Sequence, residues 1–120
     1  ASDLLRTVLG FHNAGASLPI AAKGNAGIPK FVSGKICYDG TPDLMAKYAK
    51  MAFNCGAKII GGCCGTTPDH IKAMRLSLEN CDQALMPSLD EISNNIGPFS
   101  SDSDGTDGAK KPTRIRRIDR

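Results

Sequence analysis

The chain has 120 residues, 41% of them hydrophobic and 5% aromatic, which leaves room for one small domain. No apolar run approaches the ~20 residues of a membrane-spanning helix, and nothing resembles a signal peptide, so no membrane partner is expected. Five cysteines without regular spacing argue against a secreted disulfide framework and predict a cytoplasmic protein. The net charge of +3 comes from a basic C-terminal tail without aromatic residues for base stacking, so no nucleic-acid partner is expected.

The first part of the chain predicts a helix and then a strand. Ser2 and Asp3 are typical of a helix N-terminus, and the three- and four-residue spacing of apolar side chains that follows predicts a buried stripe of Leu5, Val8 and Leu9. This helix is expected to end between residues 13 and 15. Residues 18–22 form a short apolar run between turn residues, which predicts a strand buried on both faces.

A hairpin and two similar helices are predicted next. Residues 31–38 carry two short apolar runs around Ser33-Gly34, which favours a hairpin. The triplet Thr41-Pro42-Asp43 opens a helix, and the same triplet returns at residues 67–69, after a strand at 58–60. The apolar faces predicted for the two helices are Leu44, Tyr48, Met51 and Cys55 in the first, ended by Gly56, and Ile71, Met74 and Leu78 in the second.

The alternation of helices and strands predicts an α/β protein with parallel strands and right-handed crossovers. A doubly wound sheet and a (β/α)8 barrel would both place functional loops at the carboxyl ends of the strands, but two strands form neither alone. Residues 81–96 are expected to be a C-terminal extension with a short helix in 88–96. Residues 97–120 lack the apolar side chains for a core and are expected to be a disordered acidic-then-basic tail.

Two adjacent thiols dominate the chemistry of the sequence Gly61-Gly62-Cys63-Cys64-Gly65-Thr66-Thr67. Neighbouring residues on a strand face opposite sides, so both thiols meet one metal only where the glycines let the backbone turn. Thiolates are preferred zinc ligands, and a catalytic zinc takes three protein ligands, so the pair supplies at most two. The alternatives are buried or reactive cysteines, and a redox module is disfavoured because redox pairs usually have two residues between the cysteines.

Together with Asn25-Ala26-Gly27 at the preceding strand end, this motif resembles the last part of the homocysteine S-methyltransferase family, over residues 1–80. The family includes betaine-homocysteine methyltransferases, S-methylmethionine-dependent enzymes and the homocysteine module of cobalamin-dependent methionine synthase. The resemblance implies the C-terminal part of a (β/α)8 TIM barrel, strands seven and eight with helices six to eight, incomplete in this chain. The chain is therefore expected to be part of a longer protein.

The resemblance implies a zinc ion bound by Cys63, Cys64 and a third cysteine, which is expected upstream of Ala1. Cys37, Cys55 and Cys81 are poor substitutes for it, because Cys55 is expected in the core and Cys81 after the last helix. Cys37 lies on the correct side, in the predicted hairpin, and stays a weak alternative ligand. Neither cysteine of the pair would be the nucleophile, since the zinc-bound substrate sulfur takes that role.

The implied reaction is methyl transfer to the thiol of homocysteine, which forms methionine. Substrate-binding residues are expected to be Asn25, Gly27, Gly65 and Thr66, the last two through backbone N–H groups that receive a carboxylate. Asn25 has two further interpretations, as a residue that orients the zinc loop and as a simple turn former. The methyl donor stays open between betaine or a related compound, S-methylmethionine and methylfolate.

The same residues leave room for a second hypothesis, a noncatalytic barrel fragment that completes its fold with another chain or domain. The oligomeric state stays open, with a homo-oligomer as one candidate. In both cases the isolated chain is expected to be inactive and to bind zinc weakly.

Overall fold

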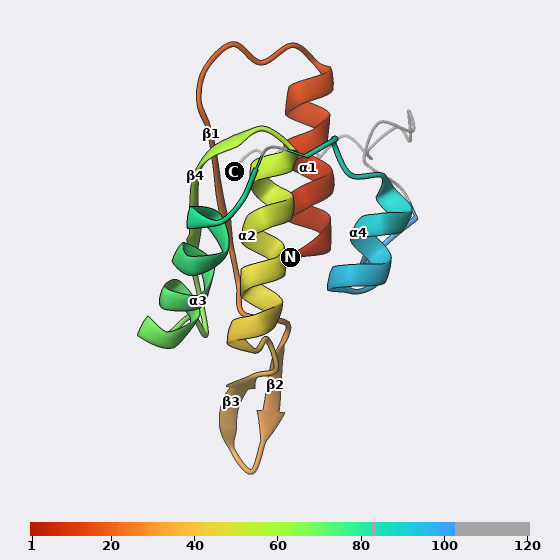
Figure 1. Cartoon of the computed structure of the whole chain (residues 1–120). Helices are drawn as coiled ribbons and strands as arrows, with labels where there is room; N and C mark the ends of the chain where they lie inside the picture. The colour runs from red at the N-terminus through yellow and green to blue at the C-terminus, as the bar shows by residue number, and fades with distance from the viewer. Residues whose placement is uncertain (83, 103–120) are drawn as a thin grey trace, which may run out of the picture.

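The computed structural model describes residues 1–82 and 84–102 and has an α/β architecture (Figure 1). In chain order the elements are α1 (Ser2–Asn13), β1 (Ile20–Gly24), β2 (Pro29–Val32), β3 (Lys35–Tyr38), α2 (Pro42–Asn54), β4 (Ala57–Gly62), α3 (Pro68–Glu79) and α4 (Leu89–Ile96). The predicted alternation of helices and strands is confirmed. Among these described residues no helix is both long enough and apolar enough to cross a membrane.

Strands β1 and β4 pair in parallel, as predicted, and their carboxyl ends coincide. The register places Ala22 beside Ile60 and Gly24 beside Gly62. Both strands therefore stop at the same edge of the sheet, and the loops that follow them start side by side. This register brings Asn25 and Cys63 together, although they lie 38 positions apart in the sequence.

The prediction of a strand at 18–22 that is buried on both faces is wrong in two respects. The strand begins at Ile20 and continues to Gly24, and Leu18 outside it is 80% exposed. Within it Ala21 is exposed while Ala22 is buried, so the helices cover only one face. A short apolar run cannot by itself distinguish a strand covered on both faces from one covered on a single face.

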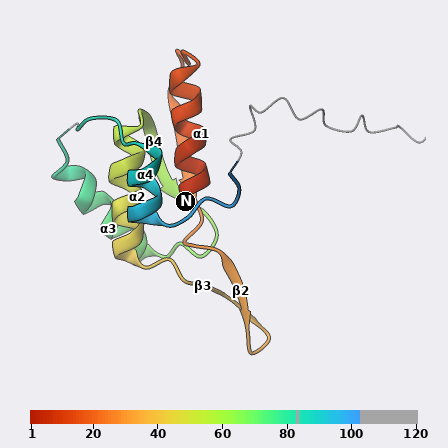
Figure 2. The ribbon, with the colours of Figure 1, turned by 90° about the vertical axis from the view of Figure 1, so that its right-hand side faces the viewer.

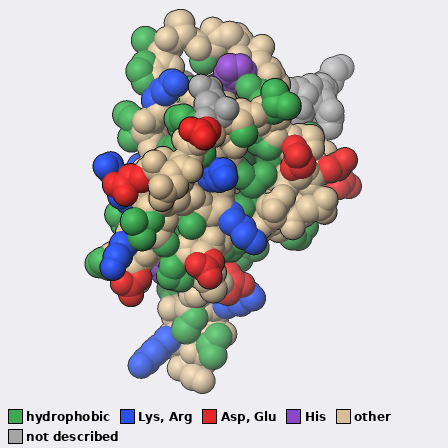
Figure 3. Space-filling view, in the orientation of Figure 1, with side chains coloured by type: hydrophobic (Ala, Val, Ile, Leu, Met, Phe, Trp, Pro, Cys, Tyr) green, Lys and Arg blue, Asp and Glu red, His purple; other side chains and the backbone are tan. Residues whose placement is uncertain are grey.

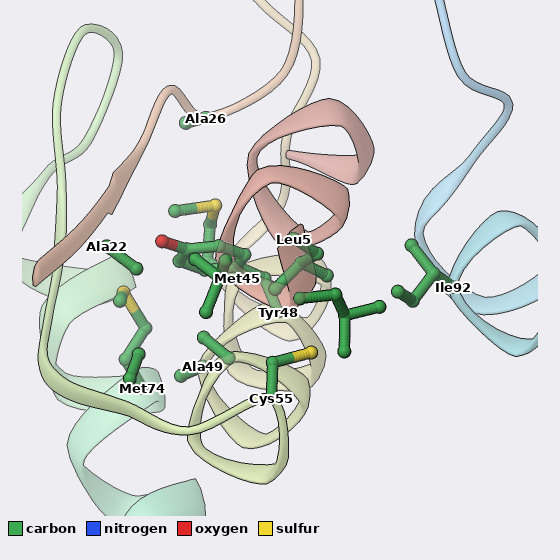
Figure 4. Close-up of a cluster of buried hydrophobic side chains, with 13 residues drawn as sticks. Leu5, Ala22, Ala26, Met45, Tyr48, Ala49, Cys55, Met74 and Ile92 are labelled. Atoms are coloured by element: carbon green, nitrogen blue, oxygen red, sulfur yellow. The ribbon is translucent and has the colours of Figure 1, made fainter. Parts of the chain in front are cut away.

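The core lies between α1, α2 and the covered face of the sheet (Figure 4). The predicted stripe of α1 is confirmed, since Leu5 and Val8 are almost completely buried. The predicted face of α2 is displaced by about one residue. Helix α2 packs against α1, α3, α4 and β4 together, so its buried arc is centred on small side chains that allow close approach. The buried residues of α2 are Met45, Tyr48, Ala49 and Ala52, followed by Cys55, whereas Leu44 and Met51 are half-buried.

The predicted hairpin is confirmed and projects from one end of the molecule (Figures 1 and 2). Strands β2 and β3 pair antiparallel, with Phe31 opposite Ile36. The two turn residues, Ser33 and Gly34, have φ angles of 50° and 75°, the left-handed conformation that a two-residue hairpin turn requires. Tyr38 ends β3 where the hairpin returns to the body of the molecule.

The C-terminal part of the described chain packs against α1 and α2. Ser88 caps α4, as the predicted helix in 88–96 requires, and Ile92 of this helix is fully buried. The segment after α4 continues along the first turn of α1, where the Asp3 carboxylate accepts a hydrogen bond of 3.1 Å from the Ser100 N–H. The Arg6 guanidinium lies 4.5 Å from the centre of the Phe99 ring.

Two expectations concern this region. The N-cap of α1 is Ala1 rather than the predicted Ser2, and the Ser2 hydroxyl instead donates a 2.6 Å hydrogen bond to the Gly97 carbonyl. This long-range partner could not be read from local capping preferences. Of the predicted tail at 97–120, residues 97–102 belong to the described chain and contact α1, whereas 103–120 lie outside the described residues.

Candidate functional site

The turn that contains the two adjacent cysteines is anchored to the end of β1. The Cys63 N–H donates a 2.9 Å hydrogen bond to the Gly24 carbonyl. In the opposite direction, the Ala26 N–H donates a 2.9 Å hydrogen bond to the Cys64 carbonyl. The parallel ladder thus continues beyond the sheet and fixes the cysteine turn to the loop after β1.

The thiols of Cys63 and Cys64 lie on the same side of this turn and are exposed. Their sulfur atoms are 3.9 Å apart. A disulfide would require about 2.05 Å, whereas two sulfurs that each lie about 2.3 Å from one tetrahedral zinc ion are roughly 3.8 Å apart. The pair therefore has a spacing that suits two thiolate ligands of one metal ion. Within residues 1–82 and 84–102 no cluster of three or more His, Cys, Asp or Glu side chains is placed to hold a metal ion.

Glycine is required at two positions around the pair. A Cβ atom on Gly62 would collide with the Thr66 side chain. Gly65 has a φ of +76°, and a Cβ atom there would overlap the Tyr38 side chain, lying only 2.6 Å from its Cβ. The left-handed Gly65 allows the backbone to leave strand geometry and still pass closely under an aromatic ring. The glycine-dependent turn predicted from the motif is present.

The side chain of Asn25 contacts the cysteine turn directly. Its Oδ1 accepts a 3.2 Å hydrogen bond from the Cys64 N–H. Asn25 therefore helps to hold the cysteine turn in place, while its substrate-binding role stays a prediction. Position 27 requires glycine, because its φ is +89° and a Cβ atom there would collide with Asp39 and Gly40.

The carboxylate-binding role expected of Gly65 and Thr66 stays a prediction, and the structure shows where the neighbouring backbone donors point. The Thr66 N–H donates a 3.1 Å hydrogen bond to the Cys63 carbonyl and so closes the cysteine turn. The Thr67 N–H donates 3.1 Å to Nδ1 of His70. Both donors are therefore engaged within the chain. The Thr66 hydroxyl is buried and has no partner among the described residues, and it points at Gly62.

Tyr38 is a site residue that the sequence analysis missed. Its ring covers Gly65, and its phenol lies near the Cys64 thiol. Partial desolvation raises the pKa of Tyr38, and the neighbouring Cys64 and Cys63 raise it further. No local periodicity marks this residue, because its contacts lie in a loop 26 positions later.

The other three cysteines lie elsewhere. Cys37 is exposed and precedes Tyr38 in β3, so strand alternation points it to the opposite face from the side chain that reaches Cys64. Cys55 is fully buried at the end of α2, as predicted, and burial raises the pKa of its thiol to about 11. Cys81 is half-buried just after α3.

His70 is the second missed residue. The predicted buried stripe of α3 was Ile71, Met74 and Leu78, but Ile71 is 47% exposed and His70 is buried together with Met74. The i, i+4 spacing of His70 and Met74 was a signal for this face. The ring of His70 bonds to Thr67 on one side and, through Nε2, to the Gly40 carbonyl at 2.7 Å on the other.

Two sequence similarities bear on this site. The methionine synthase of Mycobacterium leprae (strain TN) is 34% identical to the chain over 73 residues, which are 60% of this chain and 6% of that protein. The chain thus spans a small part of that relative. The sequence profile of the family described as homocysteine S-methyltransferase matches residues 1–78, which include both strands of the parallel sheet and the cysteine turn. The chain therefore belongs to the homocysteine S-methyltransferase family.

Proposed function

We propose that the chain forms part of a zinc-dependent enzyme that transfers a methyl group to the thiol of homocysteine and so forms methionine. The observation that carries the proposal is the exposed Cys63–Cys64 pair, whose 3.9 Å sulfur separation suits a shared metal ion. Family membership supports the reaction class. The position of the pair at the carboxyl ends of parallel strands supports a (β/α)8 barrel, whose active sites lie at that face.

The chemical problem is the substrate thiol, which is mostly protonated at neutral pH because a free thiol has a pKa of about 8.5. When bound, zinc would supply the positive charge that favours the thiolate of the substrate. Cys63 and Cys64 would hold the ion, and a third thiolate is proposed to come from outside the described residues. Two neighbours would position the pair, Asn25 through the hydrogen bond that it accepts from the Cys64 N–H and Tyr38 through the packing of its ring on Gly65. A reducing compartment such as the cytoplasm would keep these sulfurs available.

The proposal is tested with the protein that carries this chain, purified with zinc. We expect Cys63→Ser and Cys64→Ser each to lose most of the bound zinc and to reduce methionine formation by about 100-fold or more, since a thiolate ligand is removed. Cys37→Ser is the matched control, because Cys37 is equally exposed but points away from the pair. Assays with betaine, S-methylmethionine and methylfolate in parallel identify the donor. Unchanged zinc content in both pair variants would refute the metal site.

A second candidate function is a noncatalytic chain that completes a barrel with another chain. The observation that favours it is the open parallel sheet, in which Ala21 and Ile59 sit side by side on the face that no helix covers. This hypothesis predicts that loss of Cys63 and Cys64 leaves assembly with the partner unchanged. The proposed enzyme instead predicts that the pair is needed for zinc and for turnover.

A further inference from the structure

We propose that His70 is a positioning residue for the cysteine pair, through a closed ring of hydrogen bonds that joins three separate loops beneath the two thiols. The role assigned to the pair rests on the proposed function, but the ring itself consists of contacts within the chain. His70 belongs to α3, only 8% of it is exposed, and it touches neither thiol in the contacts described above.

The hydrogen-bond partners of His70 assign its tautomer. A backbone N–H can only donate, so Nδ1 must accept from the Thr67 N–H at 3.1 Å and carries no proton. The Thr67 hydroxyl, 2.7 Å from the same nitrogen, is then a second donor to it. The neutral ring therefore has its proton on Nε2, which donates to the Gly40 carbonyl at 2.7 Å.

From Gly40 the ring of hydrogen bonds leads back to the cysteines. The Gly40 N–H donates a 2.9 Å hydrogen bond to the Ala26 carbonyl. The Ala26 N–H in turn donates a 2.9 Å hydrogen bond to the Cys64 carbonyl. The backbone from Cys64 to Thr67 closes the ring at His70. A Cβ atom on Gly40 would collide with the Ala26 backbone, so the close contact of these two loops also requires glycine.

The hydrogen bonds on the two sides of the imidazole span very different distances in the sequence. The bond to Thr67 spans three positions and caps α3, which a local capping residue could do alone. The bond to Gly40 spans 30 positions and is buried. Only this second bond connects α3 to the loop that supports Cys64. Its loss leaves a buried carbonyl unsatisfied and one side of the ring open.

Two variants separate these functions. In His70→Asn the side-chain oxygen lies near the position of Nδ1 and can accept from Thr67, but the side chain is too short to reach Gly40. In His70→Gln the terminal amide lies near the position of Nε2 and can donate to the Gly40 carbonyl, while the local cap is lost. His70→Asn thus keeps the hydrogen bonding on the Thr67 side of the ring, and His70→Gln keeps the bond on the Gly40 side.

The readout is amide hydrogen exchange in the protein that carries this chain, with cobalt(II) titration of the same variants as an independent measurement. We expect the amides of Ala26 and Gly40 to exchange at least about tenfold faster in His70→Asn and to stay near wild type in His70→Gln. Loss of the bond to Gly40 should lower the free energy of local opening by about 1.4 kcal/mol, which corresponds to a tenfold faster exchange rate. Where cobalt binds through the thiols, its affinity should follow the same order, with a loss of about tenfold in His70→Asn.

Equal exchange at Ala26 and Gly40 in the two variants would overturn the inference. A uniform acceleration that includes the β1–β4 amides in His70→Asn would also overturn it, since it would mark a merely structural residue. Slow exchange of Ala26 must also be seen in wild type. If the exchange pattern separates as expected while wild-type protein shows no thiolate-to-cobalt charge-transfer band, the ring stands and the proposed metal site fails.

Discussion

At the scale of single residues, burial distinguishes Cys55 from the exposed Cys63–Cys64 pair. It also makes the free energy of unfolding depend on pH in the alkaline range. Burial raises the pKa of Cys55 from 9.0 to about 11, because the thiolate would lose its solvation. A folded-state pKa above the unfolded value stabilises the protein fully below the unfolded pKa. This contribution is lost as pH rises from about 9 through 11, where the unfolded thiol ionises first.

We therefore predict that Cys55→Ala flattens the pH dependence of stability. The free energy of unfolding of wild type, measured in urea, should fall more between about pH 8 and pH 10 than that of the variant. Tyr48, whose pKa burial raises to about 12, contributes at higher pH and is left intact in both proteins. Cys37→Ala, at an exposed position, should keep the wild-type slope. Parallel slopes in all three proteins would contradict the prediction.

The residues of the site divide into those that local sequence marks and those that it cannot mark. Cys63 and Cys64 were identified because glycines beside adjacent thiols have few structural uses other than a turn. Tyr38 and His70 were missed because their partners, Gly65 and Gly40, lie 27 and 30 positions away. Such contacts depend on the register of β1 and β4, which no local pattern encodes.

At the scale of elements, the hairpin and the cysteine turn are coupled where the Tyr38 ring covers Gly65 (Figure 2 shows the hairpin from the side). We predict that Gly65→Ala destabilises the protein by about 1–2 kcal/mol through its left-handed φ, and by more through the collision with the ring. In a Tyr38→Ala background only the first part should remain. Urea denaturation of the four proteins of this double-mutant cycle measures the coupling between the two positions.

A loss on Gly65→Ala that is the same in both backgrounds would show that the ring does not restrict the turn. Ser33→Ala is the control for a general effect on the hairpin, because Ser33 also has a positive φ of 50° but lies at the hairpin tip. It should weaken β2–β3 without any coupling to Gly65.

Helix starts were the most predictable elements, because their capping chemistry is local. Thr41 accepts a 3.2 Å hydrogen bond from the Leu44 N–H, as the Thr-Pro-Asp triplet indicates. Strand burial was less predictable, since whether both faces of β1 are covered depends on which other elements are present. The buried face of α2 was displaced for a related reason, because four neighbouring elements and not one determine it.

At the scale of the whole molecule, large apolar side chains remain on the surface (Figure 3). Ile59 of β4 is 59% exposed and Phe31 of the hairpin is 77% exposed. The β1–β4 sheet described here has two strands and hence two unpaired outer edges. An open sheet edge beside uncovered apolar side chains favours association, because both hydrogen bonds and apolar area become available to another molecule.

We predict that the purified chain associates in a concentration-dependent manner and that Ile59→Thr weakens this association. Threonine keeps the β-branched shape that a strand prefers but exposes less apolar area, so the strand itself should persist. Ile71→Thr is the matched control, because Ile71 is similarly exposed, at 47%, but belongs to helix α3 and not to a strand. Sedimentation velocity over a range of concentrations measures the effect. If the uncovered sheet face drives association, only Ile59→Thr shifts the distribution towards monomer. Equal shifts in the two variants would assign the association to general surface hydrophobicity. A wild-type protein that stays monomeric at every concentration would contradict the prediction.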